Sequence, residues 1–151
     1  MKIIVLAGGL STERDVSLSS AAGICRTLLE KGHDAFLLDV FMGLEHTPEN
    51  LEDVFTLPDH GLDIVKNIST EEPDLAAVKA SRPDQSDCFF GPNVIELCRL
   101  ADITFLGLHG GEGENGKLQA AFDLLGIKYT GPDSLGCAVA MHKGVAKQIP
   151  T

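Results

Sequence analysis

The chain has 151 residues, of which 44% are hydrophobic and 23% are charged, and its formal net charge is −10. This size and composition are those of one globular domain with a core of its own, and they exclude a disordered chain. The negative charge argues against a broad basic face that binds nucleic acid or anionic membranes, although a local pocket for a small anion remains compatible with it.

The N-terminal part predicts a strand, a loop, a helix and a second strand. Residues 2–7 are short, aliphatic and followed by glycines, which is typical of a buried parallel strand. A helical stripe of apolar residues follows: Leu18, Ala21, Ala22, Cys25, Leu28 and Leu29. We expect Ser17 to be the N-cap of this helix and Gly32 to end it. Residues 35–40 then predict the second strand of a βαβ unit.

Residues 41–92 predict an irregular insertion, because prolines and acidic residues interrupt every regular pattern there. Within it, residues 62–68 are a candidate strand and residues 75–80 a candidate short helix. No chemistry is assigned to this region from its residues. We expect it either to cover a sheet edge or to make a subunit contact.

Regular patterns return after residue 92. The elements expected there are a helix from residue 94 to 101, a strand at 103–109, a helix at 117–125 that ends at Gly126, a short strand at 127–130, and a last helix from about 135 to 148 with Ser134 as its N-cap. Strands that alternate with helices predict an α/β fold, with an open, mainly parallel sheet flanked by helices. In such sheets ligands bind beyond the carboxyl ends of the strands.

Two glycine-rich loops fall at such strand ends, over residues 8–17 and 109–119. A loop of this kind presents free backbone N–H groups and a helix N-terminus, which suit an anionic group. For either loop alone, an ordinary strand-to-helix turn is the more frequent explanation. Two such loops in the same topological position favour a binding site.

The four cysteines show no Cys-x-x-Cys spacing and lie in or beside apolar stretches. We therefore expect reduced, buried thiols in a cytoplasmic protein. Met1 leads directly into the first strand, so no signal peptide is expected. No apolar run approaches the length that spans a membrane.

The loops carry motifs that resemble those of a known family. The first reads Gly8-Gly9-x-Ser11-x-Glu13-Arg14-x-Val16-Ser17-Leu18-x-Ser20, and the second reads His109-Gly110-x-x-Gly113-Glu114-x-Gly116-x-Leu118-Gln119. Gly126-Ile127-x-Tyr129-x-Gly131 and Met141-x-Lys143 follow in order. The series is similar to that of the D-alanine–D-alanine ligases. The similarity covers roughly residues 1–40 and 93–149.

The resemblance implies that residues 1–151 form the pre-ATP-grasp, Rossmann-like N-terminal domain of such a ligase, without the central and C-terminal ATP-grasp domains. The complete enzyme would join two D-alanines through an acylphosphate, for peptidoglycan and the cell wall. It would use ATP and Mg²⁺, with metal ligands outside this chain, and act as a homodimer. The fragment alone is expected to be inactive. The choice between D-alanine and D-lactate as second substrate stays open.

Two alternatives remain at this stage. The chain is also compatible with a stand-alone module that binds a small amino acid. It is compatible, in addition, with the N-terminal domain of another carboxylate–amine ligase.

The resemblance assigns the first substrate to residues of the first loop. Glu13 matches the family glutamate that anchors the ammonium of the first D-alanine, and a carboxylate gives a strong charge-assisted bond there. Val16 and Ser17 would line the same pocket. Without the motif, Glu13 is more simply explained as a surface acid near a helix start, where the helix dipole favours it.

The second loop and the last helix supply the other candidates. His109 matches a family histidine beside the first substrate, Gly110 would shape the loop around it, and Lys143 matches a lysine that reaches an ATP phosphate. A lone strand-end histidine is more often structural, and a late-helix lysine more often faces solvent. Three positions depart from the residues usual in the family. Asn115 stands where an aspartate is usual, Lys117 where a small hydroxyl residue is common, and His142 where an aspartate is usual.

Overall fold

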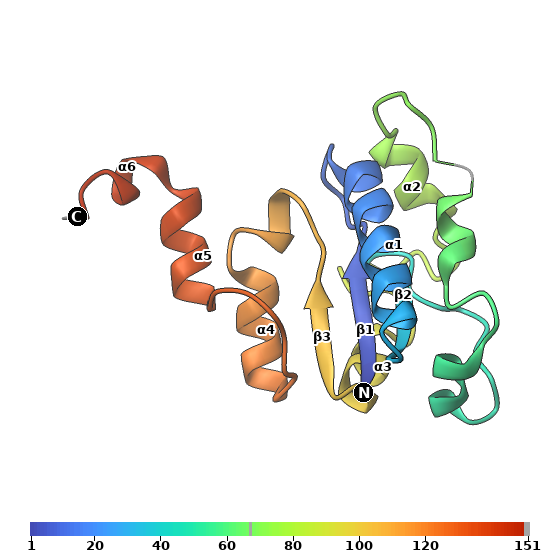
Figure 1. Cartoon of the computed structure of the whole chain (residues 1–151). Helices are drawn as coiled ribbons and strands as arrows, with labels where there is room; N and C mark the ends of the chain where they lie inside the picture. Colours follow the sequence, from blue (N-terminus) through green and yellow to red (C-terminus); the bar gives the residue numbers. More distant parts are fainter. Residues whose placement is uncertain (67, 150–151) are drawn as a thin grey trace.

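A computed structural model describes residues 1–66 and 68–149 of the chain. Its centre is a parallel sheet of three strands in the order β2-β1-β3, formed by β1 (Lys2–Ala7), β2 (Asp34–Asp39) and β3 (Ile103–Leu106). The structure confirms the predicted open parallel α/β sheet flanked by helices (Figure 1). The described helices include none that is both long and apolar enough to cross a membrane.

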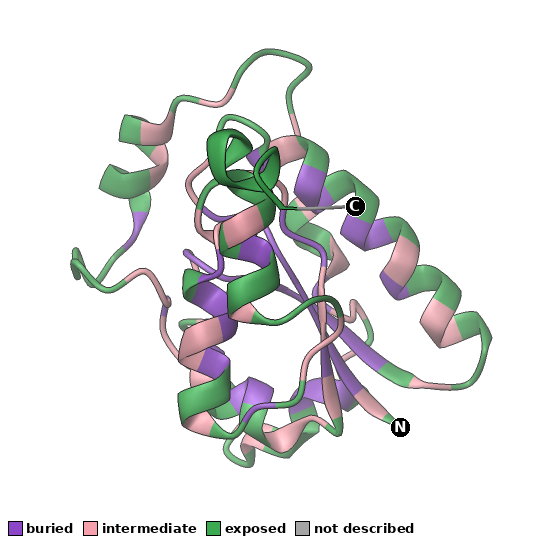
Figure 2. Cartoon of the chain, turned by 90° about the vertical axis from the view of Figure 1, so that its left-hand side faces the viewer, coloured by how far each residue is buried: buried purple, intermediate pink, exposed green. Residues whose placement is uncertain are grey.

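Each face of the sheet has its own core because successive residues of a strand point to opposite faces. Ile3 and Val5 pack with the buried stripe of α1 (Arg14–Glu30). On the other face, Ile4 and Leu6 pack against the helices α3 (Val94–Leu100) and α4 (Lys117–Leu125). The continuous apolar runs of the strands follow from this coverage on both faces. Figure 2 shows the buried residues gathered along the sheet and on the inner side of α1.

Residues 41–92 hold three short elements: the 3₁₀ helices η1 (Leu51–Thr56) and η2 (Leu62–Val65) and the helix α2 (Leu75–Ser81). The short helix was predicted. The strand predicted at 62–68 is wrong, because 62–65 form η2; residue 67 of that range lies outside the described residues. The insertion covers the edge of β2, where the Leu37 N–H donates to the carbonyl oxygen of His60 at 2.9 Å.

The structure shortens or moves several other predicted elements. The third strand ends at Leu106 instead of 109, and residues 107–108 lead into the second glycine loop. The strand predicted at 127–130 is reduced to one parallel bridge between Thr104 and Tyr129. The last helix is broken at His142 into α5 (Ser134–Met141) and α6 (Lys143–Ala146).

The predicted helix caps are also corrected. Ser17 lies inside α1, which begins one turn earlier, and Glu13 occupies the N-cap position. The cap of α5 is Asp133, not Ser134, because the Asp133 carboxylate accepts the Gly136 N–H at 2.7 Å. Gly32 and Gly126 do follow their helices in left-handed conformations, with φ of 82° and 67°.

Candidate functional site

The two glycine loops meet at the carboxyl ends of β1 and β3. Ser17, fully buried on α1, bridges them: its hydroxyl accepts the Gly8 N–H at 3.0 Å and donates to the Gly107 carbonyl at 2.7 Å. This hydroxyl is therefore committed to two backbone groups that would otherwise be buried without partners. The sequence led us to expect Ser17 as a helix cap and a pocket wall. Its observed contacts are those of a link between neighbouring strand ends.

A second bridge brings Glu13 onto the second loop. The Ser11 hydroxyl donates to the His109 carbonyl at 2.6 Å and accepts the Glu13 N–H at 3.2 Å. Gly110, with φ of 69°, leaves room for the Glu13 carboxylate: a Cβ there would lie 2.9 Å from Glu13 Oε2. Glu13, His109 and Gly110 thus come together, held by a serine to which sequence reasoning gave no role. The place of Ser11 in the first motif was the signal that could have identified it.

A buried ion pair between Arg14 and Asp39 holds the first loop against the end of β2. The Arg14 guanidinium pairs with the Asp39 carboxylate at the end of β2 and donates to the Gly9 carbonyl at 2.8 Å. Asp39 also accepts the backbone N–H groups of Phe41 and Met42, at 3.0 and 3.2 Å. Both charges are buried, so each depends on these partners for its solvation. Sequence analysis missed the pair, although an aspartate that ends an apolar strand was a visible signal.

A side chain of α4 contacts the second loop and helps to fix its conformation. Gln119, almost fully buried on α4, donates to the Gly113 carbonyl at 2.9 Å. Gly113 has no space for a side chain, because a Cβ would lie 2.4 Å from Leu108 Cβ. Asn115, one of the unusual positions, accepts the Lys117 N–H through its side-chain oxygen at 3.1 Å. An aspartate would make the same bond, so this departure preserves the local geometry.

The cleft between the loops is closed in this structure. The loop residues that surround it, together with Phe89, leave no volume that a water molecule could occupy. Glu13 is exposed, so a ligand held by its carboxylate would lie on the outer surface of the junction. The described residues also bring together no group of three or more His, Cys, Asp or Glu that could hold a metal ion.

Comparison with known proteins identifies the family. The family model described as D-ala D-ala ligase N-terminus matches residues 2–132. The chain belongs to this family.

Curated relatives carry the same name. The chain is 46% identical over 151 residues to the D-alanine–D-alanine ligase of Lacticaseibacillus casei, covering 99% of this chain and 41% of that protein. It is 47% identical over 152 residues to the ligase of Pediococcus pentosaceus, covering 99% of this chain and 42% of that protein. The chain thus spans about two fifths of the length of these relatives.

Solved structures of D-alanine–D-alanine ligases share the fold. The enzyme from Coxiella burnetii aligns with a TM-score of 0.59 at 24% identity, covering 98% of this chain and 40% of that chain. The enzyme from Bacillus anthracis complexed with ATP aligns with a TM-score of 0.58 at 21% identity, covering 98% and 34%. At these identities the likeness establishes the fold alone.

The remaining candidates of this ligase-family domain lie apart from the junction. Val16 is 59% exposed and lines a groove of about 650 Å³ between α1 and residues 68–73. Lys143 lies at the start of α6, where every described residue from 141 to 149 is exposed. In Figure 1, α5 and α6 extend away from the sheet as an arm. The structure therefore groups Glu13, His109 and Gly110, and it places Val16 and Lys143 elsewhere.

Proposed function

We propose that this chain is the N-terminal substrate-binding domain of an ATP-dependent D-alanine–D-alanine ligase that acts in the cytoplasm in cell wall biosynthesis. The observation that supports it is the Glu13 carboxylate, which lies beside Gly110 at the carboxyl edge of a parallel sheet in a chain of this family. Ligand sites of open α/β sheets lie at this edge.

Glu13 would bind the ammonium of the first D-alanine. The Ser11 bridge fixes the Glu13 backbone against the loop opposite, and the Glu13 carboxylate lies beside Gly110. His109, half-buried on the opposite loop, would contact the substrate from the other side. Ser17 would act through the loops that it joins, since its hydroxyl is already occupied.

ATP, when bound, would supply the phosphoryl group that activates the D-alanine carboxylate. The one residue of this chain that we assign to it is Lys143, whose exposed ammonium on α6 is accessible to a phosphate. Residues outside this chain would complete the nucleotide site and hold Mg²⁺. The homodimer that the family resemblance implies would likewise be formed by the complete enzyme.

The exposure of Glu13 favours a domain of a larger enzyme over a stand-alone module that binds an amino acid at this junction. A module that binds a small amino acid alone needs a concave site that surrounds most of the ligand. Here the junction presents Glu13 on an open surface. A second protein surface facing this junction would enclose the substrate.

The test is a chimaera in which this chain replaces the matching part of the Lacticaseibacillus casei ligase. The unmodified chimaera should form D-alanyl-D-alanine. Glu13→Gln removes the charge that pairs with the substrate ammonium, so KM for the first D-alanine should rise at least about 30-fold. Steady-state kinetics at varied D-alanine and saturating ATP measure it.

Asp15→Asn is the matched control. Asp15 is an acid of the same first helical turn, but it faces the groove with residues 68–73. Its substitution should leave KM within about twofold, the scale of a rim charge. Equal effects of the two substitutions would contradict the assignment of Glu13. A folded but inactive unmodified chimaera would contradict the proposed function.

A further inference from the structure

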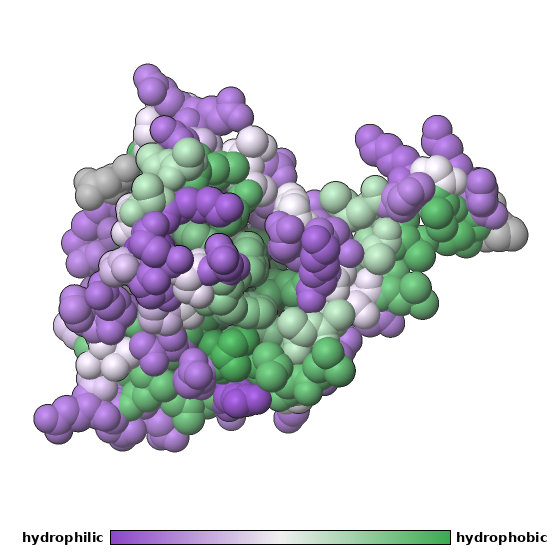
Figure 3. Space-filling view, turned by 180° about the vertical axis from the view of Figure 1, so that it is seen from behind, coloured by the Kyte–Doolittle hydropathy of each residue, from purple (hydrophilic) through white to green (hydrophobic). Residues whose placement is uncertain are grey.

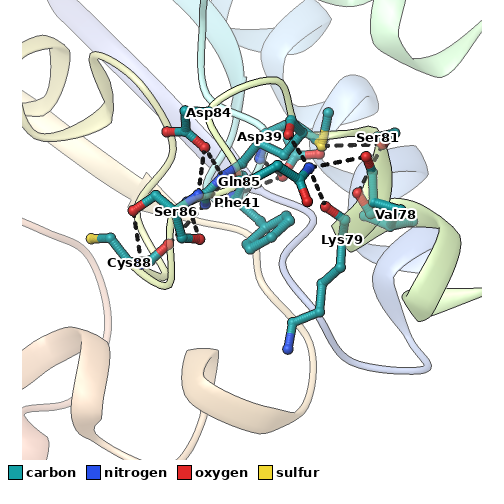
Figure 4. Close-up of polar contacts among 12 residues, drawn as sticks. Asp39, Phe41, Val78, Lys79, Ser81, Asp84, Gln85, Ser86 and Cys88 are labelled. Carbon is teal, nitrogen blue, oxygen red and sulfur yellow. Dashed lines mark hydrogen bonds and ion pairs between the residues drawn. The ribbon is translucent and has the colours of Figure 1, made fainter.

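Arg82, in the insertion for which the sequence suggested no chemistry, is only 1% exposed. Its guanidinium donates to the carbonyl oxygens of Phe41, Ser86 and Cys88 at 3.1, 2.7 and 2.8 Å. It thereby joins the end of β2 to the loop that follows α2. Figure 4 shows polar contacts around Asp84, Ser86 and Cys88, from which the Lys79 side chain extends away.

Two further contacts hold the guanidinium in place. Arg82 Nε pairs with the Asp84 carboxylate at 2.7 Å, and the guanidinium lies 4.4 Å from the centre of the Phe41 ring. A buried guanidinium without such partners would lose its solvation, so the chain around it is strongly constrained. The carbonyl of Cys88, which immediately precedes Phe89, is one of the fixed points.

Phe89 extends from this fixed point to the glycine loops. A Cβ on Gly9 would lie 3.5 Å from Phe89 Cζ and equally close to Leu108 Cδ2. Phe89 also lines the closed cleft, together with Leu108, His109 and Gly110. One aromatic ring from the insertion therefore packs where the first and second loops meet.

Phe90 makes different contacts. Its ring stacks on Phe122 of α4 with centroids 6.0 Å apart, within the core. The rings of Phe89 and Phe90 pack edge to face, 5.9 Å apart. Both are half-buried, so they are matched in residue type, position and burial. Only Phe89 reaches the loops.

We propose that Phe89, held by Arg82, is a positioning residue for the substrate site. Glycines lose the most conformational freedom on ordering, so a loop rich in them needs contacts that limit its motion. Ser11 supplies a polar link between the loops, and the Phe89 ring supplies an apolar one that also excludes water. The proposal rests on the proposed function in one respect: the substrate bound at this junction is D-alanine.

The first test needs no catalytic activity and uses the 151-residue chain. Phe89→Leu keeps apolar character but withdraws the ring from the loops; Phe90→Leu makes the same change beside it. Amide hydrogen exchange should rise at least about fivefold at loop amides such as Gly8, Gly113 and Glu114 in Phe89→Leu only. Phe89→Tyr keeps the ring and should retain slow exchange. Equal loop exchange in both leucine variants would overturn the proposal.

The second test measures the consequence in the chimaera. Phe89→Leu should raise KM for the first D-alanine about tenfold or more, with a smaller change in kcat, because a loosened site binds poorly before it reacts. Phe90→Leu, at a similar loss of thermal stability, should leave KM near its original value. Faster loop exchange with unchanged KM would overturn the positioning role. Because exchange is measured without turnover, it decides on the loop contact even where the unmodified chimaera fails as a ligase.

Discussion

Burial divides the four cysteines into two groups. Burial raises the pKa of Cys25 to about 11 and that of Cys98 to about 12, and it also raises the pKa of Cys137. Cys88, in contrast, is exposed, which corrects the expectation that all four thiols are buried. Cys25 and Cys98 ionise more readily in an unfolded chain. The stability that their thiol forms contribute is full below about pH 9 and is lost as pH rises through 11 and 12.

Thiol labelling at pH 8 should therefore modify one cysteine rapidly in the native chain. With a pKa near 11, only about one Cys25 thiol in a thousand is ionised at pH 8. A chromogenic disulfide should show one fast equivalent, and Cys88→Ser should remove it. Cys25 and Cys98 should react only in denaturant or as pH approaches 11, and the burial of Cys137 should slow its reaction at pH 8. A fast phase that survives in Cys88→Ser would contradict this division.

At the residue scale, the motifs indicated where Glu13, His109 and Gly110 lie, whereas the patterns indicated less about the residues around them; the roles of the three residues stay predictions. The motif placed all three at strand ends, and the structure brings them together. Ser17 was mistaken for a cap because its partners, Gly8 and Gly107, lie 9 and 90 residues away from it in the sequence. No local pattern states which distant carbonyl a hydroxyl will meet.

At the element scale, α4 and α5 meet through a glycine. Gly116, just before α4, has φ of 90°, and a Cβ there would lie 2.3 Å from the Ser134 carbonyl oxygen. Gly126, just after α4, has φ of 67° but no atom within 4 Å of a built Cβ. Both positions favour glycine for backbone reasons. Only Gly116 adds close backbone packing.

Alanine substitutions at Gly126 and Gly116 should separate the free-energy cost of a left-handed backbone from the cost of close packing against α5. Gly126→Ala should lower the free energy of unfolding by about 1–2 kcal/mol, the cost of a left-handed residue. Gly116→Ala should lower it by about 2–5 kcal/mol, since overpacking against the α5 backbone adds to that cost. Urea unfolding monitored by circular dichroism compares them directly. Equal losses would show that the approach of α5 to Gly116 is not maintained in solution.

Periodic elements were predictable, and those fixed by distant contacts were not. The range of α4 was predicted to the residue, because its apolar stripe and Gly126 mark both the face and the end. The insertion resisted interpretation because Arg82 and the His60 carbonyl organise it through partners up to 41 residues away. The break between α5 and α6 was missed because the His142 side chain accepts the Val145 N–H and starts a new turn.

At the scale of the whole molecule, the α5–α6 arm carries an exposed apolar surface. Leu135, Met141, Val145 and Ile149 are between 41% and 71% exposed, and Figure 3 shows apolar residues along this arm. A soluble domain rarely leaves such a series uncovered along one projecting segment. In a ligase more than twice the length of this chain, the arm would contact the remaining protein, which would bring Lys143 to the nucleotide.

Lys143→Met tests this placement by comparing two molecules. In the 151-residue chain the side chain is exposed, so thermal unfolding should change little. In the chimaera the loss of one charge-assisted contact to phosphate should raise KM for ATP and lower kcat, by about tenfold or more in kcat/KM. Lys147→Met is the control, because it removes a charge from the same arm one turn later. If Lys143→Met lowers the stability of the chain while the ATP kinetics stay unchanged, Lys143 is a structural residue of the arm and not a phosphate ligand.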